Sequence, residues 1–186
     1  AVRPAHRRSC EFARDDGHER IGGLILELET MASLGKLGGS MALFFGAVGS
    51  CLGVGAAGMA AVGSWKKCFA QNKAAPFVLV TFVGAPLSQT IYGMILMNQM
   101  AAKCTQGAGV TAEQFALAVS NWPAMLGMGL FGGMAMGLSA WMQGRIGASA
   151  SDAMAETGKG FGNYLMALGI IETVALFVMV FIAGLL

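Results

Sequence analysis

The chain of 186 residues is 55% hydrophobic and only 12% charged, with a mean hydropathy of +0.63. A soluble domain carries about 25% charged residues, so this composition excludes an ordinary water-soluble protein. The net charge of +2 excludes a protein that binds polyanions such as nucleic acid. The four cysteines, at positions 10, 51, 68 and 104, lack paired CxxC spacing, so we expect neither disulfides nor a zinc site.

Residues 1–30 differ from the rest of the chain because they hold five of the twelve basic residues and six of the ten acidic ones. They lack the apolar core and the cleavage site of a signal peptide. Met31 stands just before the first long apolar segment. We therefore expect a polar N-terminal extension that is not native, with the native chain starting at Met31. A genuine disordered extension is the alternative.

Four apolar intervals lie between the remaining charges and hold about 29, 29, 31 and 27 residues. Each exceeds the roughly 20 residues that an α-helix needs to cross the hydrocarbon core of a membrane. Because backbone groups in lipid must bond to one another, such intervals form helices rather than open strands. The sequence thus predicts an all-α membrane protein whose four transmembrane helices lie near 38–63, 76–99, 120–147 and 162–185.

The distribution of lysines between the helices predicts the orientation in the membrane. The 64–75 loop carries Lys66, Lys67 and Lys73, so the positive-inside rule places it in the cytoplasm and both termini outside. The predicted organisation is a first transmembrane hairpin at 31–100, an external connection at 101–119 and a second transmembrane hairpin at 120–186.

The two hairpins resemble each other. An offset of about 83 residues superposes Gly46 on Gly129 and Gln89 on Glu172, and one added residue then superposes Gly53 on Gly137. A regular glycine frame at such a period indicates two tandem copies of one helical hairpin.

The first helix of each predicted hairpin carries a stripe of small residues, spaced by three or four, within 46–63 and 133–147. Glycine weakens a helix by about 1 kcal/mol relative to alanine, so these stripes indicate close approach of backbones. Packing inside one four-helix bundle explains one stripe, and two stripes favour an inner wall shared by many subunits. Residues 53–58 also read GxGxxG, but no strand precedes them, so we expect no dinucleotide site.

Glu172 is the only ionisable residue in the last interval, with twelve residues before it back to Gly160 and fourteen after it. A charge in the middle of the bilayer costs about 2.5–3.5 kcal/mol on insertion scales, so we expect Glu172 to be functional. The alternative is a protonated glutamic acid that donates a hydrogen bond between helices.

Other polar residues are expected to reach the same depth as Glu172. Gln89 corresponds to Glu172 in the repeat, with Ser88 beside it and Tyr92 one turn further on. Pro86 lacks a backbone N–H and should kink this helix. A turn at 157–158 would bring Gln143 level with Glu172, with Arg145 reaching toward water.

These polar side chains offer hydroxyl and amide oxygens together with one negative charge. Such a set suits a hard monovalent cation, because the oxygens replace its hydration shell and the complex is neutral. A proton needs only the carboxyl group, so the additional oxygens favour Na⁺ over H⁺ as the coupling ion. We expect no covalent cofactor, and Tyr92 is expected to orient the carboxylate.

The sequence resembles a known family, the K-type membrane-ring proteolipid of bacterial V-type (V/A-type) rotary ATPases, over about residues 33–186. Three segments carry the resemblance: Ala85-Pro86-Leu87-Ser88-Gln89-Thr90-Ile91-Tyr92-Gly93, the stretch from Gly137-Leu138-Ser139-Ala140 to Gln143-Gly144-Arg145, and Ile171-Glu172-Thr173. Ser88 stands where the sodium-transporting members often have threonine. The residues after Glu172 depart from the usual pattern.

The resemblance implies that the sodium ion is held by the Ala85 carbonyl, Ser88, Gln89, Gln143 and Glu172, with Tyr92 steadying the carboxylate. It also implies a homo-oligomeric rotor ring in a bacterial plasma membrane, in contact with lipid, with central-stalk subunits and with a stator subunit that has an essential arginine. A proteolipid of this kind couples ion translocation to ATP hydrolysis or synthesis and is not itself an enzyme.

Two other classes remain open. A small secondary transporter would bind its substrate at Glu172 and the glutamines, although such transporters usually have inverted repeats and broken helices. A tetraspan membrane scaffold would have no ion chemistry and would not need Glu172.

Overall fold

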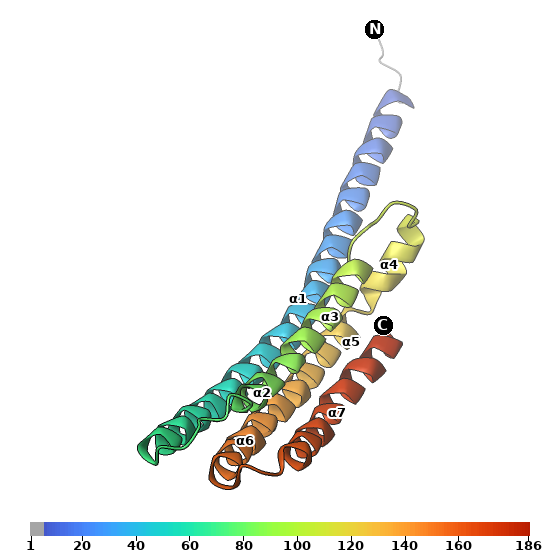
Figure 1. Ribbon diagram of the computed structural model, residues 1–186. Helices are drawn as coiled ribbons and strands as arrows, with labels where there is room; N and C mark the ends of the chain where they lie inside the picture. Colours follow the sequence, from blue (N-terminus) through green and yellow to red (C-terminus); the bar gives the residue numbers. More distant parts are fainter. Residues whose placement is uncertain (1–5) are drawn as a thin grey trace.

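The computed structural model describes the backbone of residues 6–186 and the side chains from residue 20 onward. Every regular element in this part of the chain is a helix, so the predicted all-α class is confirmed. Figure 1 shows the helices side by side in one elongated bundle. The elements are α1 (His6–Ala70), α2 (Leu79–Gly84), the 3₁₀ turn η1 (Ala85–Leu87), α3 (Ser88–Lys103), α4 (Ala112–Ser120), α5 (Trp122–Gly127), the π-helical turn η2 (Met128–Gly132), α6 (Gly133–Thr157) and α7 (Phe161–Leu185).

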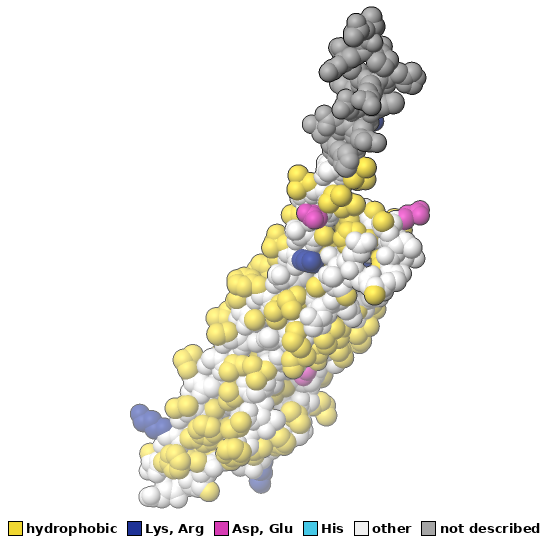
Figure 2. All heavy atoms as spheres, turned by 90° about the horizontal axis from the view of Figure 1, so that it is seen from above, with side chains coloured by type: hydrophobic (Ala, Val, Ile, Leu, Met, Phe, Trp, Pro, Cys, Tyr) yellow, Lys and Arg dark blue, Asp and Glu magenta, His cyan; other side chains and the backbone are white. Residues whose placement is uncertain are grey.

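Four segments of this bundle are long and apolar enough to cross a membrane, as predicted. They are Arg20–Ala70, Leu79–Lys103, Trp122–Thr157 and Phe161–Leu185. Apolar side chains are spread along the whole visible surface of the described part, and most of the charged ones lie toward the ends (Figure 2). Two of these segments extend well past the predicted boundaries: the first begins at Arg20 and ends at Ala70, and the third ends at Thr157.

Helix α1 runs without interruption across Met31. The side chains of residues 20–30 are mostly exposed, in contrast to the tightly packed part of α1 that follows. Residues 1–5 of the predicted extension lie outside the described residues. Where the native chain starts stays a prediction.

The two glycine stripes pack against each other within this one chain. A Cβ atom on Gly49 would lie 2.1 Å from the backbone oxygen of Gly137, and one on Gly144 would lie 2.1 Å from that of Gly53. Only glycine permits two helix backbones to approach so closely. The contact between α1 and α6 therefore accounts for the central part of both stripes within one chain. The inner wall shared by many subunits stays a prediction.

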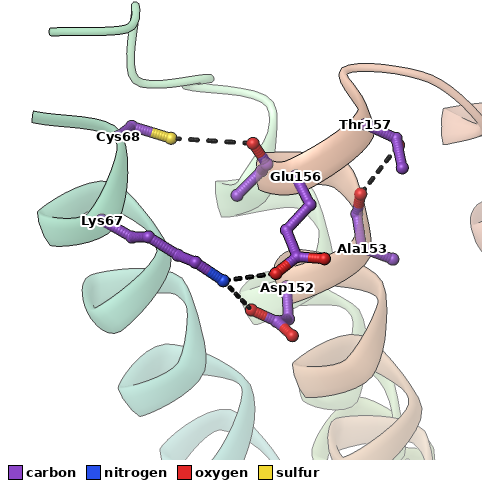
Figure 3. A network of polar contacts seen from close by, with 7 residues as sticks. Lys67, Cys68, Asp152, Ala153, Glu156 and Thr157 are labelled. Carbon is purple, nitrogen blue, oxygen red and sulfur yellow. Dashed lines mark hydrogen bonds and ion pairs between the residues drawn. The ribbon is translucent and has the colours of Figure 1, made fainter. Parts of the chain in front are cut away.

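The α1–α2 loop and the α6–α7 turn lie at one end of the bundle (Figure 1). At this end Lys67 of α1 bonds to Glu156 of α6 and lies 3.8 Å from Asp152 (Figure 3). The indole N–H of Trp65 donates to the Pro76 carbonyl at 2.9 Å and holds the loop against α1. The Lys67 contacts tie the first hairpin to the second.

The opposite end contains a helix that the sequence analysis placed inside the 101–119 connection. Thr111 and Gln114 form a reciprocal capping box, in which each side chain accepts from the other's backbone N–H, and this starts α4. Beneath it, Val119, Met125 and Met100 form an apolar cluster with Ala32 of α1. The connection is therefore folded onto the bundle.

Candidate functional site: a carboxylate between three helices

The turn η1 and the start of α3 bring three oxygen atoms together. The sequence predicts a kink at Pro86, which has no backbone N–H, and the structure has the 3₁₀ turn η1 at this position. The Ser88 hydroxyl oxygen lies 3.2 Å from the Ala85 carbonyl oxygen and 3.2 Å from Oε1 of Gln89. This segment therefore places a carbonyl, a hydroxyl and an amide oxygen side by side.

Helices α6 and α7 bring Gln143 and Glu172 to the same level. Helix α6 ends at Thr157, and Gly158 and Gly160 adopt positive φ values of 65° and 88°, which glycine permits. The predicted turn is thus confirmed. Nε2 of Gln143 donates to Oε2 of Glu172 at 3.3 Å and to the Leu168 carbonyl at 3.1 Å.

The π-helical turn η2 lies next to the point where the offset between the two repeats changes. The offset rises by one residue between Gly132 and Gly137, and η2 ends at Gly132. A π-helical turn accommodates one additional residue inside a continuous helix. Below this turn Gly137 and Gly144 lie against α1, while Gln143 faces α7. The wide turn is thus consistent with a helix that absorbs one additional residue and still keeps its small residues against α1 and Gln143 toward α7.

A continuous chain of hydrogen bonds links α3, α6 and α7. The Tyr92 hydroxyl donates to Oε1 of Glu172 at 3.0 Å. Nε2 of Gln89 donates to Oε1 of Gln143 at 2.9 Å, and both glutamines are fully buried. Glu172 itself is half-buried. In this geometry Gln143 presents its N–H, and not its carbonyl oxygen, to the carboxylate.

No basic side chain neutralises Glu172 among the side chains that the structure describes, where both ion pairs involve Lys67. Arg145 is exposed, with its guanidinium carbon 5.6 Å from the centre of the Trp141 ring. The carboxylate is therefore held only by the neutral donors Tyr92 and Gln143. A site of this kind can still receive a proton or a cation.

All six candidate residues from the sequence meet in this network: Ala85, Ser88, Gln89, Tyr92, Gln143 and Glu172. The sequence analysis did not identify Ser139, whose hydroxyl donates to the Ile171 carbonyl at 2.8 Å and joins α6 to α7. Its position one turn before Gln143 on the same helical face is the signal that could have found it. The described side chains contain no cluster of three or more His, Cys, Asp or Glu residues that would hold a metal.

Residues 126–183 match the family model of the C subunit of ATP synthase. The match runs from the end of α5 into α7 and includes both Gln143 and Glu172. No curated protein matches the chain. Proteins of this family form homo-oligomeric rings in ATP synthases. The second hairpin is thus similar to the C subunit of ATP synthase, and this similarity together with the four apolar helices supports a multi-pass integral membrane protein of the rotor-ring proteolipid type.

Proposed function

We propose that this chain is the K-type proteolipid of a V-type rotary ATPase and that Glu172 carries Na⁺ across the membrane. The observation that carries the proposal is a carboxylate in the middle of an apolar helix, bonded only to neutral groups, with Tyr92 at 3.0 Å and Gln143 at 3.3 Å. A bare carboxylate at this depth is costly, and a bound cation lowers that cost because it cancels the charge.

The oxygen atoms around Glu172 support a cation larger than a proton. The Ala85 carbonyl, the Ser88 hydroxyl and Oε1 of Gln89 are grouped at separations of 3.2 Å. Half a turn of the Gln143 amide would exchange its N–H for its carbonyl oxygen beside Glu172. The four neutral oxygens and the carboxylate would then surround the cation and leave the site without net charge.

The mechanism follows from this neutrality. In a ring of identical subunits, each occupied site can face lipid without exposing a bare charge. An arginine of the stator subunit displaces the cation from Glu172 when the site reaches it. Each carried charge exchanges about 2.3 kcal/mol per 100 mV with the membrane potential, so many ions are needed to match the energy of ATP. Central-stalk subunits would pass the rotation to the subunits that handle nucleotide.

The V-type assignment is supported by the number of carriers per chain. The chain has two hairpins, but Gln89 stands in the first hairpin where Glu172 stands in the second. A ring of duplicated proteolipids with one carboxylate each carries half as many ions per helix as a ring in which every single hairpin has its own carboxylate. Fewer ions per turn favour pumping against a steep gradient. The basic loop at 64–75 supports an orientation in a bacterial plasma membrane with that loop inside and both termini outside.

The test is carbodiimide labelling of the assembled complex, followed by mass spectrometry. We expect modification at Glu172 that added Na⁺ prevents. If raising the pH prevents labelling of Glu172 and added Na⁺ has no effect, the site would be assigned to H⁺ instead.

The matched variants are Glu172→Gln and Glu156→Gln, because Glu156 is an exposed carboxylate at the end of α6. Glu172→Gln should assemble into a ring of normal mass but abolish ion-coupled ATP hydrolysis, whereas Glu156→Gln should retain it. Normal coupled transport by Glu172→Gln would eliminate the carrier role. A monomeric or dimeric mass for the native protein would instead favour a transporter or a scaffold.

A further inference from the structure

A buried hydroxyl on α1 has no hydrogen-bond partner among the side chains and backbone that the structure describes. Ser50 is 2% exposed, and no described residue lies within hydrogen-bond distance and geometry of its Oγ atom. Several helical serines here donate to the carbonyl four residues earlier; for example, Ser151 does so at 2.9 Å. A buried polar group without a partner costs about 1–3 kcal/mol, so such a group calls for an explanation.

Packing places Ser50 against the segment that holds the candidate site. Gly46 and Gly53 lie four residues before it and three after it, on the same face of α1. A Cβ atom on Gly46 would lie 2.7 Å from the Gln89 carbonyl oxygen, and one on Gly53 would lie 2.9 Å from Cβ of Pro86. Ser50 is therefore level with the segment from Pro86 to Gln89.

When a cation is bound, one amide N–H of the site loses its hydrogen-bond acceptor. Nε2 of Gln89 now donates to Oε1 of Gln143 at 2.9 Å. If Gln143 turns its oxygen to the cation, its own N–H faces that of Gln89, and Gln89 loses its acceptor. Turning Gln89 as well would remove its oxygen from the group formed with Ser88 and Ala85. A new acceptor for the Gln89 N–H keeps all the oxygens on the cation.

We propose that Ser50 is this acceptor: a positioning residue on α1 whose hydroxyl holds the Gln89 amide when the site contains a cation. The inference rests on the proposed function and extends the site to a fourth helix. A proton on Glu172 requires no movement of either glutamine. Ser50 therefore favours Na⁺ over H⁺ without touching the ion.

The experiment compares wild type with Ser50→Ala and with Ser151→Ala in the assembled complex. Ser151 is the matched control because it is fully buried but already bonded within its own helix. Two quantities are measured by carbodiimide labelling of Glu172: the Na⁺ concentration that halves labelling, and the pH that halves it without Na⁺. Ser50→Ala should raise the Na⁺ concentration about fivefold or more and leave the pH midpoint unchanged, since an unpaired buried donor is costly.

Ser50→Cys provides a second variant, in which a slightly larger thiol offers a weaker acceptor than the hydroxyl. The Na⁺ concentration that halves its labelling should fall between those of wild type and Ser50→Ala. Ser151→Ala should match wild type in both quantities. Sodium protection that is the same in wild type and Ser50→Ala would overturn the role of Ser50 but not the proposed sodium transport. An equal shift of the Na⁺ and pH midpoints would do the same, because it indicates a general structural effect. Absence of sodium protection in wild type would overturn both this inference and the proposed sodium transport.

Discussion

Replacing Gly144 by alanine tests whether the close contact between α1 and α6 determines the stability of the bundle. The new Cβ atom would lie 2.1 Å from the backbone oxygen of Gly53 and 2.2 Å from its Cα atom. Ordinary contacts begin near 3.4 Å, so the two helices must separate by about 1 Å. Backbone cannot move aside as a flexible side chain can, and overpacking of this kind costs about 1–3 kcal/mol.

The matched control for Gly144→Ala is Gly169→Ala in α7, where an added Cβ meets no atom within 4 Å. Both variants gain the same helix propensity, about 1 kcal/mol, so their difference isolates the contact. The assay is thermal unfolding in detergent followed by circular dichroism. Gly144→Ala should unfold about 2–12 °C below Gly169→Ala, at about 2–4 °C per kcal/mol for a chain of this size. If the two variants unfold at the same temperature, the close contact between α1 and α6 does not determine the stability of the bundle.

Two further changes test how the site is held. Tyr92→Phe removes the donor that lies 3.0 Å from Glu172. The Na⁺ concentration that halves carbodiimide labelling should rise about tenfold, because hydrogen bonds to charged groups contribute about 1.5–3 kcal/mol. An unchanged value would show that the hydroxyl does not orient the carboxylate. Deletion of Phe131, an exposed residue of η2, should convert the π-helical turn to α-helix and leave the orientation of α6 nearly unchanged, because the wide turn absorbs one residue. We expect sodium protection close to wild type with unchanged helix content, and loss of protection would show that η2 is needed to hold α6 in position.

The sequence alone determined the number and approximate positions of the transmembrane helices, the irregular turn at Pro86, the turn after Thr157 and the set of residues that meet at Glu172. These predictions succeed because lipid leaves the backbone almost no alternative to a helix. Charges are too costly inside the bilayer to occur at random, so their positions mark both the helix ends and the site.

Only the tertiary structure decided which atoms of that set face each other. A glutamine offers a donor and an acceptor on one side chain, and Gln143 presents its N–H to Glu172 because the Leu168 carbonyl and the Gln89 amide surround it from two other helices. The unpartnered hydroxyl of Ser50 and the contact of the two glycine stripes within one chain likewise depend on how separate helices approach. Sequence patterns fix the face on which a residue lies, whereas the direction of a hydrogen bond depends on neighbours that are distant in the chain.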